Sequence, residues 1–178
     1  MEDLEIKRCE GIYEPLEDSY MLARAVQKFA FGKVLDLGTG SGIQGITAAL
    51  NKCEVTFSDV NPAAVECAKK NAIANGVKGH FVKSDMFDNI DGKFNTIIFN
   101  PPYLISDGKK DLALDGGIDG RKQIDKFLDS YKVHVLKKHL VLLVESSFNR
   151  YESDVKRLNA KIIEKEHYFF EDLVVLLF

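Results

Sequence analysis

Cysteine is scarce in this chain of 178 residues, and long apolar runs are absent. The three cysteines, Cys9, Cys53 and Cys67, form no C-x-x-C pair, so we expect reduced thiols in a cytoplasmic protein. The four histidines show no ligand pair at metal-binding spacing, which predicts no structural metal. No apolar run approaches the roughly 20 residues of a membrane span, and the charged N-terminus lacks a signal-peptide core. These absences indicate a soluble intracellular protein.

A strong charge of either sign is also missing. Lys and Arg number 24 against 27 Asp and Glu, which gives a net charge of −3. Proteins that hold nucleic acid usually carry a basic surface, so this balance counts against a nucleic acid substrate. The densest basic pairs, Lys109-Lys110 and Lys137-Lys138, are more typical of a solvated face. The length fits a single domain over residues 1–178 with its own core.

Short apolar runs alternate with helical patterns, which predicts an α/β fold with a mostly parallel sheet and helices on both faces. The predicted strands span residues 33–37, 54–58, 79–83, 95–99, 139–145, 161–169 and 173–178. The predicted helices span residues 15–30, 43–50, 62–75, 124–135 and 151–158. The last two strands leave room only for a tight turn between them, so they must be antiparallel. The sheet is therefore expected to have seven strands and to close with an antiparallel hairpin.

A glycine loop follows the first predicted strand, in the order Asp36-Leu37-Gly38-Thr39-Gly40-Ser41-Gly42. Glycines let the backbone turn sharply and let a ligand approach where a side chain would clash. Ligands of open α/β sheets bind at this end of the strands. Asp59, Asp85 and Asn100 end the second, third and fourth strands, so we expect these polar residues and Asp36 to ring one cleft.

Two ligands are compatible with the glycine loop. The loop contains G-x-G-x-x-G beginning at Gly40, with Asp59 at the spacing of a ribose-binding acid, which is typical of a nicotinamide-dependent dehydrogenase. In the register that begins at Gly38 the pattern is G-x-G-x-G instead. The Asp36 carboxylate at the strand tip would repel a pyrophosphate and attract the cationic end of S-adenosylmethionine, which favours the latter. The third interpretation is a plain tight turn in which Asp36 caps the next helix.

The tetrapeptide Asn100-Pro101-Pro102-Tyr103 follows the fourth predicted strand. Its two prolines stiffen the chain and would fix Asn100 and the carbonyl group of Pro101 in one orientation. The Asn100 side-chain oxygen and that carbonyl can each accept one hydrogen of a planar NH2 group. Two such acceptors would aim the nitrogen at a methyl group and stabilise the positive charge that develops on it. Tyr103 would cover the planar group and a nearby sulfonium. The alternative is a rigid strand exit.

Several segments resemble the HemK-type glutamine methyltransferases, in their shorter eukaryotic and archaeal branch. These segments are Tyr13-Glu14-Pro15-Leu16-Glu17-Asp18-Ser19, Leu35 to Gly42, Ser58 to Pro62, the tetrapeptide, and Leu114-Asp115-Gly116-Gly117 with Asp119-Gly120-Arg121. The family position of Asp36 is often Glu, which keeps the charge. The resemblance implies a class I, Rossmann-like methyltransferase, in which residues 1–30 form a helical extension packed on the cofactor site.

The resemblance also implies a set of site residues and partners. Those implied to contact S-adenosylmethionine are Ser19, Asp36, Gly38, Gly40, Asp59, Asp85, Met86 and Asn100. Those implied to hold the target amide are Asn100, Pro101, Pro102 and Tyr103. The implied substrate is the glutamine in the Gly-Gly-Gln tip of a peptide release factor. A small zinc-binding activator protein would dock along the third strand, which is the expected sheet edge.

Other functions stay open. The tetrapeptide fits the N6 amine of adenine in DNA or RNA equally well, although such enzymes flip the base and usually carry a recognition region and a basic surface. This chain has room for neither. Protein lysine methylation is a further possibility, and a nicotinamide-dependent dehydrogenase rests only on the glycine loop. A non-catalytic subunit that binds S-adenosylmethionine is disfavoured by the intact tetrapeptide.

Overall fold

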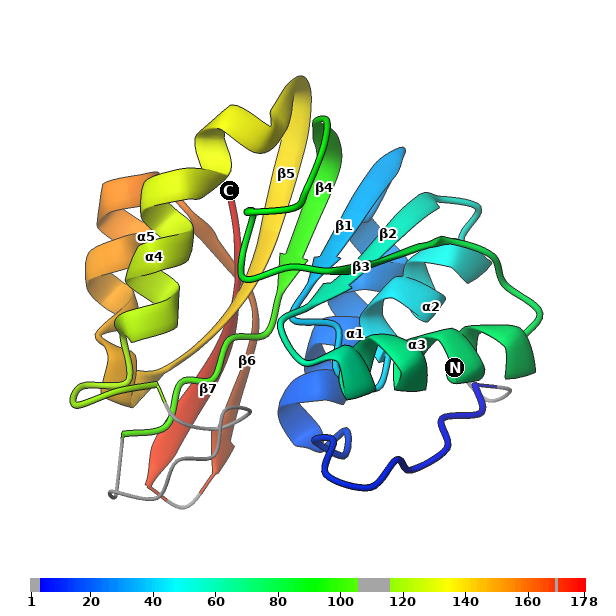
Figure 1. Cartoon of the computed structure of the whole chain (residues 1–178). Coiled ribbons are helices and arrows are strands. Elements are labelled where there is room, and N and C mark those ends of the chain that lie inside the picture. The colour runs from blue at the N-terminus through cyan, green and yellow to red at the C-terminus, as the bar shows by residue number, and fades with distance from the viewer. Residues whose placement is uncertain (1–3, 106–115, 169) are drawn as a thin grey trace.

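A seven-stranded sheet runs through the centre of the structure, in the order β3-β2-β1-β4-β5-β7-β6 (Figure 1). The computed structural model describes residues 4–105, 116–168 and 170–178. The strands are β1 (Lys33–Leu37), β2 (Glu54–Asp59), β3 (His80–Lys83), β4 (Phe94–Phe99), β5 (Val135–Ser146), β6 (Lys161–Tyr168) and β7 (Glu171–Leu177). The helices are α1 (Glu17–Phe29), α2 (Ile43–Leu50), α3 (Pro62–Ala74), α4 (Lys122–Ser130) and α5 (Tyr151–Leu158). Short 3-10 turns, η1 (Tyr131–His134) and η2 (Ser147–Asn149), flank β5.

The pairing of the strands confirms the predicted fold class. Strands β3, β2, β1, β4 and β5 are parallel to one another, and β7 is antiparallel to both β5 and β6. Residues 141–144 of β5 are completely buried, as expected for a continuous apolar run at the centre of a parallel sheet. Strand β3 is an edge strand, as predicted.

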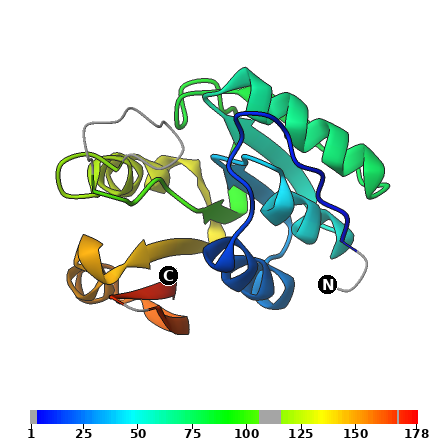
Figure 2. The same cartoon turned by 90° about the horizontal axis from the view of Figure 1, so that it is seen from below.

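Each face of the sheet carries its own hydrophobic cluster. One cluster joins the sheet to α1, α2 and α3, with Met21, Ile46 and Ala68 at its centre. The other joins it to α4 and α5, through side chains such as Phe127 and Tyr151. The two helical groups lie on opposite sides of the sheet (Figures 1 and 2). Helix α3 begins as predicted, since the Asn61 side chain accepts a hydrogen bond from the Ala63 backbone N–H and Pro62 takes the first position.

The start of β5 differs from the prediction. The helix expected over 124–135 ends at Ser130, and β5 begins at Val135 rather than His139. Val135 pairs with Phe94, but the next aligned pair is Leu140 with Thr96, so a bulge lies between them. The bulged residues include the exposed Lys137 and Lys138. Because these residues are polar, the apolar pattern that predicted the strand began only after them. Strand β7 likewise begins two residues early, at the polar pair Glu171-Asp172, and Phe169 lies outside the described residues.

The prediction of three reduced cysteines is wrong for two of them. Cys9 and Cys67 form a disulfide with a Cα–Cα distance of 6.1 Å, and Cys53 is free. The pairing depends on the path of residues 4–13, which follow α3 and then turn at residues 10–12 before α1 begins (Figure 2). We call these residues the N-terminal strap. Their sequence shows no periodicity that would place them against α3.

Within the ranges given above, none of the helices combines the length and the apolar character needed to cross a membrane. The same part of the chain contains no group of three or more His, Cys, Asp or Glu side chains placed to hold a metal ion.

Candidate active site

A cavity lies at the carboxyl ends of β1, β2, β3 and β4, where the sequence predicted a cleft. Its walls include nine of the predicted residues: Ser19, Asp36, Gly38, Gly40, Asp59, Asp85, Met86, Asn100 and Pro102. Pro101 and Tyr103, also predicted, do not line it. Wall residues that were not predicted include Tyr13 and Gly11 of the N-terminal strap, Gln44 of α2 and Gln123 of α4. The strap and α4 thus close the cavity from two sides.

The glycine loop forms one wall, and its backbone explains its composition. Gly38, Gly40 and Gly42 have φ angles of 64°, 52° and 89°, which side-chain-bearing residues rarely adopt. A Cβ at Gly42 would also lie 3.0 Å from the backbone of Ala68 on α3. The loop is tied to the end of β2 by a bond from the Thr39 N–H to the Ser58 carbonyl, of 2.8 Å. It can therefore present backbone N–H groups to a ligand from a fixed position.

The Asp36 carboxylate stabilises this loop by hydrogen bonds. Its Oδ2 atom accepts hydrogen bonds from the Thr39 hydroxyl (2.6 Å) and from the Gly45 backbone N–H (2.9 Å). The second bond satisfies a free N–H at the start of α2, so the capping role considered in the sequence analysis is present. Asp36 is only 2% exposed, and burial raises its pKa to about 7 although both bonds act in the opposite direction. Asp36 also lines the cavity, so a cationic ligand group beside it would favour the ionised form.

Asp59 connects the end of β2 to the glycine loop. Its Oδ2 atom accepts a bond from the Gly40 N–H (3.0 Å), and its Oδ1 atom accepts one from the Asn61 N–H (2.9 Å). Burial raises the pKa of Asp59, and these backbone bonds act against that shift. The carboxylate is thereby held at the cavity wall with a defined orientation.

Asp59 is predicted to contact S-adenosylmethionine, so its replacement with alanine should lower the affinity for that ligand. Hydrogen bonds to a charged group contribute about 1.5–3 kcal/mol each, so the loss of one ligand contact predicts a roughly 10- to 100-fold higher Kd. Isothermal titration calorimetry measures it directly. Asp88→Ala, an exposed acid beyond β3, is the control and should leave the Kd unchanged. An unaltered Kd in the Asp59 variant would remove this residue from the cofactor site.

Asn100 is held in one orientation by a residue that the sequence analysis did not select. Its Nδ2 atom donates a 2.9 Å bond to Oδ2 of Asp18, which is 4% exposed at the start of α1. A carboxylate can only accept, so the Asn100 side-chain oxygen is turned away from Asp18. That Oδ1 atom is buried and has no hydrogen-bond partner among the described residues. Asp18 belongs to the Tyr13–Ser19 segment quoted for the resemblance, and that segment was the signal for it.

The Asp18 carboxylate is itself fixed by several donors. Its Oδ1 atom accepts bonds from the Ser19 backbone N–H (2.6 Å), the Ser19 hydroxyl (3.1 Å) and the Tyr13 hydroxyl (3.1 Å). The Tyr103 hydroxyl lies 3.5 Å from Oδ2. Burial, together with the Asp18 charge, raises the pKa of both phenols well above the ordinary value, so both hydroxyls remain donors. The Tyr103 hydroxyl therefore contacts Asp18, although Tyr103 does not line the cavity.

Ser84 to Met86 complete the wall beyond β3. The Ser84 hydroxyl bonds the Met86 carbonyl (2.9 Å), and Met86 has a φ of 49°. Asp85 forms a 2.7 Å ion pair with Lys126 of α4, although both side chains are about half exposed. Such exposed pairs contribute little to stability. Asp85 is thus the most solvated of the three predicted acids.

The end of the tetrapeptide is anchored to Asn149 of η2, which follows β5. The Asn149 Nδ2 atom donates to the carbonyl groups of Tyr103 (2.9 Å) and Gly120 (3.3 Å), and a Cβ at Gly120 would lie 2.4 Å from the Tyr103 oxygen.

Arg121 forms ion pairs with Asp154 (2.7 Å) and with Glu145 (3.5 Å). Burial and the nearby Asp154 raise the pKa of Glu145 to about 8. Of the predicted segment, Leu114 and Asp115 lie outside the described residues, as do Lys109 and Lys110.

Comparisons with known proteins agree with this geometry. The profile of the methyltransferase small domain matches residues 17–116. A Methanocaldococcus jannaschii protein, provisionally named a protein N5-glutamine methyltransferase, is 33% identical over an alignment of 188 positions, which covers 99% of this chain and 95% of that protein. A ribosomal RNA small subunit methyltransferase C of Serratia proteamaculans is 36% identical over 108 residues, but these cover 58% of this chain and 31% of that protein.

A solved structure extends the comparison to three dimensions. In the Mtq2–Trm112 complex of E. cuniculi, described as responsible for methylation of the translation termination factor eRF1, the matching chain has 28% identity and a TM-score of 0.75. The match covers 94% of this chain and 97% of that chain. These similarities confirm the resemblance to the glutamine methyltransferases that the sequence motifs indicated. The chain belongs to the methyltransferase small-domain family.

Proposed function

We propose that this chain transfers a methyl group from S-adenosylmethionine to the side-chain amide nitrogen of a glutamine in a peptide release factor, in the cytoplasm. The observation that carries the proposal is the Oδ1 atom of Asn100 at the wall of the cavity, which is buried and has no hydrogen-bond partner among the residues that the structure describes. A buried acceptor without a donor is costly, and in a ligand-binding cavity its natural partner is an N–H group of the ligand.

The cavity fits S-adenosylmethionine. One wall is glycine backbone in a conformation that leaves space for a ligand, and at Gly40 an added Cβ would meet no atom within 4 Å. Asp36 and Asp59 supply carboxylates for a cationic group and for ribose hydroxyl groups. We assign Ser19, Gly38, Asp85 and Met86 to further contacts with the cofactor. When bound, S-adenosylmethionine supplies an electrophilic methyl group on a sulfonium.

Asn100 would bind and orient the target amide. An amide nitrogen is a poor nucleophile because its lone pair is delocalised into the carbonyl group. Asn100 Oδ1 can accept one of its hydrogens, which aims the nitrogen and stabilises the positive charge that it acquires. The Pro101 carbonyl is the proposed second acceptor, but Pro101 does not line the cavity, so the proposal rests on Asn100. The charge-assisted bond from Asn100 Nδ2 to Asp18 draws electron density toward Oδ1 and strengthens it as an acceptor.

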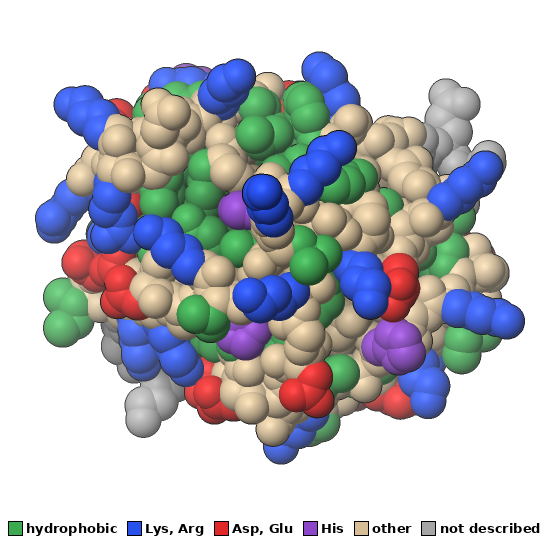
Figure 3. Space-filling model, turned by 90° about the horizontal axis from the view of Figure 1, so that it is seen from above, with side chains coloured by type: hydrophobic (Ala, Val, Ile, Leu, Met, Phe, Trp, Pro, Cys, Tyr) green, Lys and Arg blue, Asp and Glu red, His purple; other side chains and the backbone are tan. Residues whose placement is uncertain are grey.

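Two observations favour a glutamine over an adenine as the acceptor. The similarity to the protein N5-glutamine methyltransferase spans nearly the whole of both chains, whereas that to the ribosomal RNA enzyme covers about a third of that enzyme. Basic side chains are prominent on the face at the amino ends of the parallel strands (Figure 3), which is opposite the cavity. Phosphate contacts there would not bring a base to Asn100.

A labelling experiment tests the proposal. The protein is given methyl-labelled S-adenosylmethionine and, separately, a release factor, DNA and transfer RNA. Mass spectrometry of the labelled product then identifies the methylated atom. We expect label on the glutamine of the release-factor Gly-Gly-Gln tip. Label on adenine would establish the second candidate instead, and binding of NAD without S-adenosylmethionine would establish a dehydrogenase.

We also propose a small zinc-binding activator protein as partner, docked along β3. This strand forms the sheet edge, and an edge offers unpaired N–H and C=O groups to a strand of another protein. The relative from E. cuniculi is a complex with a second protein, which supports the idea. Mixing the two proteins should give a heterodimer by gel filtration with light scattering, and higher methyl transfer. If the protein is a fully active monomer, and the activator neither binds it nor changes its activity, the proposed partnership is wrong.

A further inference from the structure

Asn71 of α3 and Asn75, which caps the carboxyl end of that helix, bind the backbone of the N-terminal strap. The side chain of Asn71 accepts a bond from the Lys7 N–H (3.0 Å) and donates one to the Lys7 carbonyl (3.2 Å). Asn75, one turn later, makes the same two bonds with Glu5, of 3.0 and 2.7 Å. Asn71 and Asn75 are four positions apart and lie on the same side of the helix, so they bind alternate residues of the strap, Lys7 and Glu5. These contacts place the strap but are partly exposed to solvent, so each is weak.

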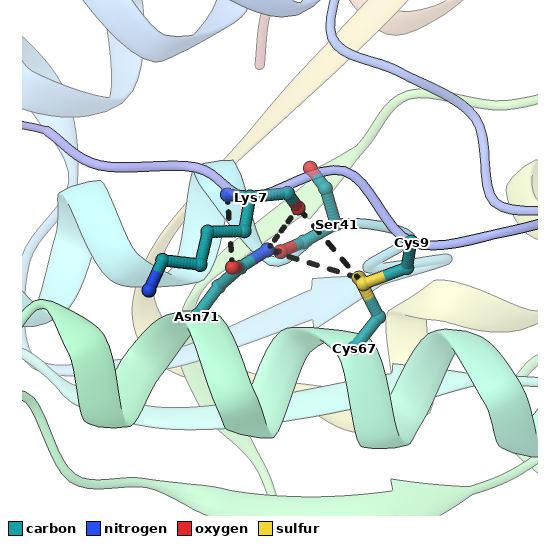
Figure 4. Close-up of a disulfide and its surroundings, with 5 residues drawn as sticks. All are labelled: Lys7, Cys9, Ser41, Cys67 and Asn71. Atoms are coloured by element: carbon teal, nitrogen blue, oxygen red, sulfur yellow. Dashed lines mark hydrogen bonds between the residues drawn. A yellow bond between two sulfur atoms is a disulfide. The ribbon is translucent and has the colours of Figure 1, made fainter.

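The disulfide lies directly beyond these contacts (Figure 4). It joins Cys9 of the strap to Cys67 of α3, across a sequence separation of 58 residues. Asn71 links the same region to the glycine loop, because its Nδ2 atom also donates to the Ser41 carbonyl (2.9 Å). Cys67 is 2% exposed, whereas Cys9 is partly exposed. A reductant in solution therefore has access to the pair from the strap side.

The part of the strap after the disulfide forms a wall of the cavity. Gly11, Ile12 and Tyr13 all line it, and the Tyr13 hydroxyl holds Asp18, which orients Asn100. The position of Cys9 therefore limits how far residues 11–13 can move away from the cavity. A covalent bond at this point fastens the strap to the helix that packs beneath the glycine loop.

We propose that Cys9 and Cys67 form a redox latch, which fixes the N-terminal strap over the cofactor cavity when oxidised and releases it when reduced. A dithiol reductant supplies the two electrons and two protons. The S–S bond breaks, two cysteine thiols form, and the reductant becomes a disulfide. In a reducing compartment the strap is held by non-covalent contacts, which are its hydrogen bonds to Asn71 and Asn75 and the packing of Leu4 and Ile6 against the core. Cofactor then enters and leaves more readily.

The effect on the cofactor rests on the proposed function, but the effect on the strap does not. Hydrogen exchange of residues 5–13 is therefore measured first, without ligand, in the oxidised protein and after dithiothreitol. We expect exchange in the strap to rise about tenfold on reduction, within the roughly 5- to 150-fold usual for coupled sites. Residues 94–99 of β4 exchange by global unfolding, so they measure how far loss of the cross-link destabilises the whole fold, and exchange in the strap should rise by more than exchange there.

Stopped-flow dissociation of S-adenosylhomocysteine is the second measurement, and we expect it to be about tenfold faster in the reduced protein. The Cys9→Ser/Cys67→Ser variant should behave as reduced with or without dithiothreitol. Cys53→Ser, which removes the free thiol, should respond like the parent protein.

Equal hydrogen exchange of the strap in the oxidised and reduced protein would overturn the latch. An equal dissociation rate of S-adenosylhomocysteine in the two states, in a protein that binds this ligand, would overturn it as well. A protein that binds no ligand in either state would contradict the proposed function, and hydrogen exchange alone would then decide the latch.

Discussion

Replacing Asn100 with alanine is expected to remove methyl transfer while leaving cofactor binding largely intact. The substitution deletes the buried Oδ1 acceptor and leaves the rest of the cavity wall in place. Removing one preorganised hydrogen-bonding group that stabilises transition-state charge costs about 100- to 1,000-fold in kcat, and the loss here should be of that order. Single-turnover transfer to a release factor measures the rate, and calorimetry measures the cofactor Kd.

Two further variants sharpen this experiment. Asn100→Asp keeps the size of the side chain but places a second carboxylate beside Asp18, so it should be as inactive as Asn100→Ala. Asn95→Ala is a control on the same strand, because Asn95 lies at the opposite end of β4 and bonds the Lys33 N–H. Turnover at the parent rate in Asn100→Ala would show that the tetrapeptide does not hold the acceptor nitrogen.

Asp18→Asn is expected to lower kcat by about 100-fold with a smaller change in the cofactor Kd, because small misplacements of a positioned group cost this much. An asparagine at position 18 can donate as well as accept, so it no longer dictates which end of the Asn100 amide faces the cavity. With Nδ2 turned inward, Asn100 would present a donor to the N–H groups of the substrate. The loss should appear in kcat more than in KM, since orientation rather than binding is affected.

Glu17→Gln is the matched control for this experiment. Glu17 is the exposed neighbouring acid at the start of α1, so its replacement removes the same charge from the same helix end. A merely structural role of Asp18 would lower the thermal midpoint and leave kcat of the folded protein unchanged. Unchanged kcat in Asp18→Asn would therefore exclude Asp18 as a positioning residue.

Local patterns predicted most of the fold. Residues 33–37 and 43–50 were assigned to their strand and helix with the observed bounds, because buried strands and amphipathic helices differ in the period of their apolar residues. The glycine loop and the strand-tip acids were placed at the cavity because parallel strands all end at the same edge. The start of β5 was missed because its first residues are polar and bulged.

Long-range contacts explain what the sequence did not predict. Cys9 and Cys67 are 58 residues apart, and Asp18 and Asn100 are 82 residues apart, so neither pairing leaves a local pattern. Asp18 looks like an ordinary acid in the first turn of a helix until Asn100 is placed beside it. The contact of the Tyr103 hydroxyl with Asp18, across 85 residues of sequence, likewise leaves no local pattern, and the predicted role of Tyr103 in covering the substrate stays a prediction.

The position of β7 has a consequence for the order in which this protein can fold during synthesis. Strand β7 follows β6 in sequence but lies between β5 and β6, paired along both sides. The Phe178 carbonyl also accepts a bond from the Val141 N–H of β5 (2.7 Å). Until residues 171–178 have left the ribosome, β5 exposes an apolar edge that invites wrong pairing. Deleting residues 171–178 would therefore remove an interior strand and separate β6 from β5, whereas deletion of an edge strand would leave the other strands paired.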